Sequence, residues 1–187
     1  VNLVGKILVF LYDEMADFEI TFAAHILGYN GQKEIITISY ENKLVTSKSG
    51  LSYSIQKTVK EALDEKDVEG LIITGGWNGE IRDELMLLIN KLNDENKLLA
   101  AICAGPRFLA KAGIFNDKKY TTSIETWEDY HKSLFEEEDP FPRENYINER
   151  VVVDKNVITS KGHAFVDFAV EIFNWFNLFK TNEEKIN

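Results

Sequence analysis

The stretch Leu98-Leu99-Ala100-Ala101-Ile102-Cys103-Ala104-Gly105-Pro106 decides the fold, because an apolar run passes directly into a helix start. Five apolar residues in a row are typical of a strand buried on both faces. Pro106 suits the first turn of a helix, where its missing N–H group would have no partner anyway. The junction residue, Cys103, should therefore present its side chain above the edge of a sheet.

The sequence on both sides repeats this alternation of strand and helix. Strands are predicted over 6–11, 34–40, 70–74 and 98–102, and helices from Phe18 to about Gly28, through Leu85 and Leu92, over 106–112 and from Phe165 to Phe176. Hairpins are predicted for 44–55 and 151–159, and a short strand for 119–122. The alternation predicts a single-domain α/β fold over 1–187, with a mostly parallel sheet sandwiched by helices.

Composition narrows the classes of partner and compartment. The net charge of −10 disfavours nucleic acid and anionic membranes, and no apolar run is long enough to span a bilayer. We expect a cytoplasmic protein, because no secretory signal is recognisable at the N-terminus. One cysteine and three scattered histidines offer neither a disulfide nor a metal site, so no metal is expected.

Cys103 is the first candidate for chemistry. A strand that turns at once into a helix forms a nucleophile elbow, and Ala104 and Gly105 are small enough to let the chain pass. The following helix N-terminus is expected to depress the pKa of Cys103 and raise its reactivity. The alternative is an inert, buried structural cysteine.

Two further features follow buried strands, where ligands of open α/β sheets gather. The amides of Gly75-Gly76, with the N–H of Ala104, are candidates for an oxyanion hole, although a tight turn would also use two glycines. Glu19 follows the first strand; it either complements the dipole of its helix or hydrogen-bonds the Cys103 thiol.

These features together resemble one family. Thr74-Gly75-Gly76, the segment 101–106, Glu19 and the closing Val151–Gly162 (VVVDKNVITSKG) look like the ThiJ/PfpI superfamily, which includes Parkinson disease protein 7 and PfpI-type proteases. The resemblance covers nearly the whole chain and implies a flavodoxin-like fold similar to the class I glutamine amidotransferase domain. It also implies Cys103 as the nucleophile, Glu19 as the acid, Gly76 (or Gly75 after a shift of one residue) as the oxyanion glycine, no cofactor, a role in stress response, and a homodimer.

One departure concerns the base. Ser123 stands where family members often carry a histidine, and no histidine-x-glutamate pair follows Cys103, so glutamine amidotransferase activity is not expected. His163, at the start of the last helix, is the candidate replacement; a capping or interface role is the alternative. His131 is interpreted as a surface residue and His25 as a packing or interface residue.

The sequence leaves three functions open. The first is a cysteine-dependent hydrolase or an enzyme for small carbonyl or acyl compounds, of the PfpI protease/amidase or deglycase/glyoxalase type. The second is a redox or stress sensor in which Cys103 itself is oxidised. The third is a binding module that retains the pocket without turnover. The acidic segment 136–142 is interpreted as a solvated loop, or alternatively as a lid.

Overall fold

A seven-stranded sheet with strand order β5-β2-β1-β6-β7-β9-β8 forms the centre of the molecule in a computed structural model, which describes residues 4–180. The strands are β1 (Lys6–Phe10), β2 (Glu34–Ser39), β5 (Lys57–Thr58), β6 (Val68–Ile73), β7 (Leu98–Ile102), β8 (Val151–Asp154) and β9 (Val157–Ser160). All neighbouring strands pair in parallel except β8 and β9, which are antiparallel. The predicted mostly parallel α/β fold is confirmed.

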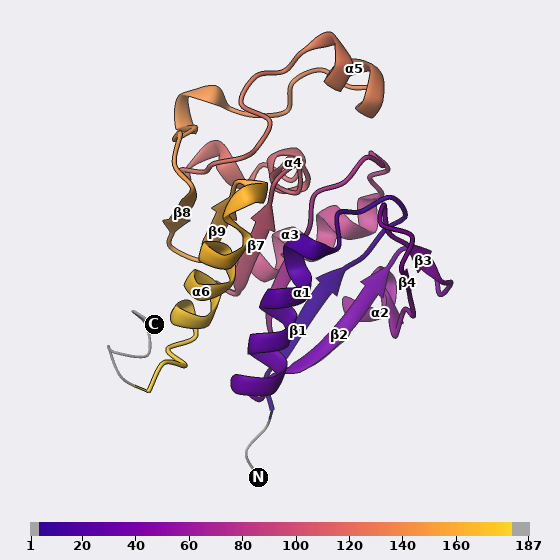
Figure 1. Cartoon of the computed structure of the whole chain (residues 1–187), viewed down its shortest axis with the longest axis vertical. Helices are drawn as coiled ribbons and strands as arrows, with labels where there is room; N and C mark the ends of the chain where they lie inside the picture. Colours follow the sequence, from indigo (N-terminus) through magenta and orange to yellow (C-terminus); the bar gives the residue numbers. More distant parts are fainter. Residues whose placement is uncertain (1–3, 181–187) are drawn as a thin grey trace.

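Helices cover both faces of this sheet (Figure 1). The helix α1 (Phe18–His25), its π-helical continuation η1 (Ile26–Asn30) and α6 (Phe165–Trp175) pack together on one face. The other face is covered by α2 (Val59–Ala62), α3 (Asp83–Asp94) and α4 (Pro106–Lys111). The central strands are therefore buried on both sides, which explains why 70–73 and 98–102 are apolar without alternation.

An excursion over 123–150 lies above the carboxyl ends of the strands and carries α5 (Asp129–Phe135), at the top of Figure 1. Three short 3-10 helices complete the described part of the chain: η2 (Ile114–Asn116), η3 (Arg143–Asn145) and η4 (Gly162–Ala164). In open α/β folds this sheet edge is the place where ligands bind. The segments that follow β1, β6, β7 and β9 all reach it.

Both predicted hairpins are present, as β3 (Val45–Thr46) with β4 (Ser52–Tyr53) and as β8 with β9. The short strand predicted for 119–122 is wrong, because the segment forms only one isolated bridge, from Tyr120 to Tyr146. Side chains satisfy the backbone on either side of that bridge: the N–H of Lys119 donates to Asp154 and that of Thr121 to the Thr159 hydroxyl.

The strand β5 and the helix α2 were not predicted from the sequence. A capping box starts α2: the Thr58 hydroxyl accepts from the Glu61 N–H, and the Glu61 carboxylate accepts from the Thr58 N–H. The sequence Thr-x-x-Glu is a readable signal for such a helix start. A four-residue helix is too short to show apolar periodicity, which is why the pattern missed it.

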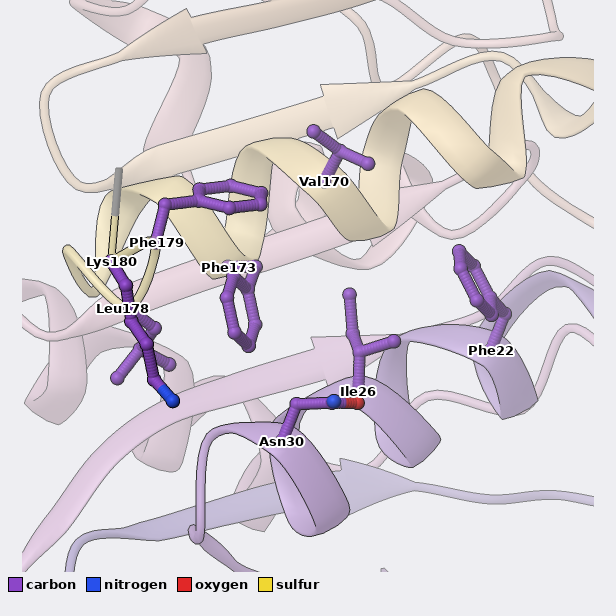
Figure 2. A pocket seen from close by; sticks show the side chains of 8 residues that line it. All are labelled: Phe22, Ile26, Asn30, Val170, Phe173, Leu178, Phe179 and Lys180. Carbon is purple, nitrogen blue, oxygen red and sulfur yellow. The ribbon is translucent and has the colours of Figure 1, made fainter. Parts of the chain in front are cut away.

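A mostly apolar groove of about 340 Å³ runs between the first and last helices (Figure 2). Phe22 and Ile26 line it from one side, and Val170 and Phe173 from the other. No helix within residues 4–180 has the length and apolar character that a membrane crossing requires.

The surroundings of Gly105 show how closely α4 approaches the sheet. A Cβ atom at this position would lie 2.7 Å from the carbonyl oxygen of Ile73 and 2.8 Å from that of Ile102. These are backbone atoms, so Gly105→Ala is expected to destabilise the protein by about 2 kcal/mol through overpacking. Gly28→Ala is the control, because its nearest neighbour is a side-chain atom of Ile35. Chemical denaturation measures both; equal stability of the two variants would contradict the expectation.

Candidate active site

Cys103 occupies the predicted elbow between β7 and α4, with a left-handed backbone at φ 63°. Its N–H donates to the Ser160 carbonyl at 2.8 Å, and its carbonyl accepts from the Thr122 hydroxyl at 2.6 Å and the Ser123 N–H at 3.0 Å. A non-glycine residue in this conformation costs about 1–2 kcal/mol. Three hydrogen bonds around one strained residue therefore fix the direction in which the thiol points.

Glu19, in the first turn of α1, is only 1% exposed, and its carboxyl group lies beside the Cys103 thiol. Its carboxyl group also accepts from the Gly75 N–H and lies 3.3 Å from the Thr74 hydroxyl. The other carboxyl oxygen, Oε2, has no hydrogen-bond partner. The structure thus brings together the two residues that the sequence singled out from separate strand ends.

Two glycines leave room for this pair. A Cβ on Gly75 would lie 2.8 Å from the Cys103 Cβ and 2.9 Å from Glu19 Oε1. A Cβ on Gly162 would lie 2.7 Å from Glu19 Oε2 and 3.1 Å from the Cys103 sulfur. Any side chain at either position would force the acid and the thiol apart.

Burial controls the protonation of the pair. It raises the pKa of Glu19 to about 7, against the lowering effect of hydrogen bonds from Cys103, Thr74 and Gly75. Burial and then the negative charge of Glu19 raise the pKa of Cys103 to about 12. The expected depression of the Cys103 pKa is therefore wrong, because α4 is only six residues long and its N-terminus does not offset burial beside an anion.

The two sites titrate as a coupled pair that holds one proton between the two pKa values. In that state a thiolate exists only when the proton resides on Glu19. The Thr74 hydroxyl has one hydrogen, and its shorter contact, 2.7 Å to the Ala16 carbonyl, takes it. The 3.3 Å contact that Thr74 makes with Glu19 Oε1 is consequently weak, and it lowers the pKa of Glu19 less than burial raises it.

The candidate oxyanion amides differ in their surroundings. Gly75 packs against Cys103 and gives its N–H to Glu19. Gly76 lies one residue further out and packs against Tyr12 and Met15. The β-bridge between Gly76 and Met15 is formed by backbone hydrogen bonds of the residues next to them in the chain, so the Gly76 N–H takes no part in it. The N–H of Ala104 hydrogen-bonds the Cys103 thiol.

The histidines do not reach the thiol. His163 is exposed at the start of η4, and within residues 4–180 no hydrogen bond joins an imidazole to Cys103. His131 accepts from the Glu128 N–H at the start of α5, and His25 stacks on Tyr29. Ser123 does contact the thiol, through a side-chain hydrogen bond.

Sequence reasoning missed Thr74, Ser123 and Gly162 as constituents of the site. Thr74 and Gly162 each follow the carboxyl end of a parallel strand, so the position rule for open sheets was a usable signal for both. Ser123 was noted only as the residue in place of a histidine. Its contact depends on the excursion folding back over the elbow, which has no local sequence signal.

The acidic segment 136–142 is partly anchored rather than wholly solvated. Arg107, a buried residue four positions after Cys103, donates to Glu137 and to the Gly79 carbonyl at 2.7 Å. Lys111 lies 3.0 Å from the same carboxylate, and Phe141 is buried. The segment is therefore tied to the helix that begins at the elbow.

The fold and the elbow define an open α/β protein with its single cysteine at a strand–helix junction, and comparison with known proteins gives the family. Residues 5–174 match the DJ-1/PfpI family, so the chain belongs to that family. It is 28% identical to "Deglycase PfpI" of Pyrococcus furiosus over 159 residues, which cover 83% of this chain and 89% of that relative.

Two further comparisons agree. The chain is 26% identical over 166 residues to "Uncharacterized protease YdeA" of Bacillus subtilis, covering 87% of this chain and 79% of the relative. The crystal structure of a DJ-1 superfamily protein from Agrobacterium tumefaciens superposes with a TM-score of 0.80 at 29% identity, over 97% of this chain and 94% of that one. The predicted resemblance is confirmed at the level of family and fold.

The coupled pair predicts a two-step pH profile for thiol alkylation. Iodoacetamide should react faster as pH rises through the Glu19 pKa of about 7, because proton transfer to the ionised carboxylate then becomes available to the thiol. Glu19→Gln should abolish that step and leave one titration, above the ordinary value of about 8.5 because burial remains. Mass spectrometry of the single cysteine measures the rates, and a Glu19→Gln profile with its midpoint still near 7 would contradict the assignment.

Proposed function

We propose that this DJ-1/PfpI family protein is a cysteine-dependent enzyme acting on small reactive aldehydes and related acyl compounds. The observation that carries the proposal is the buried contact between the Cys103 thiol and Glu19, whose pKa is raised to about 7 by burial. A group with that pKa can both accept and return a proton near neutral pH, which general acid–base catalysis requires. The names of several relatives, which are deglycases, support an aldehyde-derived substrate.

In the proposed reaction, Glu19 takes the thiol proton and the Cys103 sulfur attacks the carbonyl carbon. The S–C bond forms while the carbonyl π-electron pair moves onto oxygen, which the amides of Gly76 and Ala104 would stabilise. Glu19 then returns the proton to that oxygen, giving a thiohemiacetal. No imidazole is needed for this step, because the proton leaves and returns through one carboxyl group.

A redox sensor is the second candidate, favoured by the unpartnered Glu19 Oε2 beside the sulfur and by the lack of an imidazole contact among the described residues. Each peroxide molecule would transfer one oxygen to sulfur and leave as water, giving the sulfenic and then the sulfinic acid. A cysteine that must stay reduced before it reacts fits a reducing compartment such as the cytoplasm.

Substrate screening separates these candidates. Purified protein should consume small aldehydes measurably faster than the Cys103→Ala variant. Its peptidase and glutaminase activities should stay weak, because a positioned general base typically contributes 10²–10⁴-fold in rate and, among the described residues, no base besides Glu19 contacts the thiol. His163→Ala should change the aldehyde rate by less than about two-fold, because its side chain is exposed. Equal aldehyde loss with wild type and Cys103→Ala, together with peroxide-driven gain of oxygen at Cys103, would favour the sensor.

We also infer a homodimer that uses the outer face of α1. Phe18 on α1 and Tyr29 on η1 are 56% and 77% exposed, and Phe22 lines the groove beside α6, so an apolar stripe follows α1 into η1. Light scattering should give twice the chain mass of 21.4 kDa, and Phe18→Glu should reduce it, whereas Leu87→Glu on α3 should not. A wild-type mass of one chain at micromolar concentration would contradict this.

A further inference from the structure

The place of Ser123 is fixed by the backbone of the nucleophile itself. Its N–H donates to the Cys103 carbonyl at 3.0 Å, and the preceding Thr122 hydroxyl donates to the same oxygen at 2.6 Å. Two bonds to one carbonyl hold the start of the excursion against the elbow. Ser123 therefore keeps a constant position relative to the Cys103 sulfur.

The Ser123 hydroxyl is also oriented from the other side. Its oxygen accepts the Gly162 N–H at 2.9 Å, and Gly162 packs so closely that a Cβ there would lie 3.1 Å from the sulfur. An oxygen that already accepts a hydrogen bond from one direction turns its own hydrogen elsewhere. That geometry leaves the hydroxyl hydrogen free to turn toward the Cys103 sulfur, and the Ser123 side chain lowers the pKa of the thiol.

We propose that Ser123 is a catalytic residue of this site that stabilises the Cys103 thiolate by donating a hydrogen bond to its sulfur. The hydroxyl keeps its hydrogen throughout, so Ser123 replaces the expected histidine in position without replacing it as a base. With the Ala104 N–H and protonated Glu19 it forms a set of three donors around the sulfur. The inference rests on the proposed function, because it concerns the activation of the same nucleophile.

The test is the pH profile of iodoacetamide alkylation without any substrate. Glu19 is the titratable side chain that contacts the sulfur, and Tyr12, whose hydroxyl donates to the Thr74 carbonyl at 2.9 Å, lies nearby. Ser123→Ala should shift the midpoint of the upper step, in which the thiol titrates, upward by about one pH unit and slow the reaction about ten-fold below it, as the loss of a hydrogen bond to a charged group predicts. Ser133→Ala, an exposed serine on α5, should leave the profile unchanged.

A matched pair separates the hydroxyl from packing. Ser123→Thr keeps the hydroxyl and should stay within about three-fold of wild type, whereas Ser123→Val has nearly the same shape and should behave like Ser123→Ala. This pair also serves if Ser123→Ala fails to fold, with thermal unfolding as the check on both proteins. Identical pH midpoints for wild type and Ser123→Ala, or for Ser123→Thr and Ser123→Val, would overturn the proposal.

The outcome is independent of turnover. A shifted midpoint in Ser123→Ala, with no aldehyde consumed by wild type, would support the donor and refute the proposed reaction. Aldehyde consumption by wild type, with an unshifted midpoint in Ser123→Ala, would support the proposed reaction and refute the donor role of Ser123.

Discussion

The left-handed turn at Cys103 is the constraint on which the site depends. One strained residue lets β7 end and α4 begin without an intervening loop, so the thiol stands at the edge of the sheet. The strain is held by partners from distant parts of the chain: the Ser160 carbonyl at the end of β9, Thr122 just before the excursion and Ser123 at its start. The elbow is therefore complete only when the final strand and the excursion are in place, although its sequence signal is entirely local.

The contrast between a local sequence signal and partners from distant parts of the chain explains how much of the molecule the sequence predicted. Buried strands, the elbow and the approach of Glu19 to Cys103 follow from local composition and from the rule that parallel strands end at one edge. The direction of the Cys103 pKa did not follow, because it depends on how deeply the pair is buried rather than on which residues adjoin it. The contacts of Ser123 and Gly162 also depend on long-range packing, as does the missing strand at 119–122, where side chains satisfy the backbone.

Two buried ionisable groups beside the elbow illustrate the two ways of meeting the cost of desolvation. The buried guanidinium of Arg107 is compensated by Glu137, by the Gly79 carbonyl and by the Phe135 ring, whose centroid lies 4.3 Å from the guanidinium carbon. Glu19 has no cationic partner among the contacts that perturb it, and its pKa rises instead. The same fold thus uses one charge to anchor the excursion and leaves the other group able to exchange a proton near neutral pH.

The absence of a cation beside Glu19 among residues 4–180 also bears on the carbonyl chemistry that we propose for this site. An ion pair would hold the carboxylate ionised and lower its pKa, so the group could no longer carry the proton of the thiol. A single shuttling proton suffices for addition to an aldehyde, in which the atom that gains the proton is the oxygen formed by the attack. Cleavage of an amide additionally requires protonation of a departing amine, away from the sulfur, and hydrolysis requires activation of water. A thiol with one carboxyl partner is therefore chemically better matched to reversible carbonyl addition than to peptide hydrolysis.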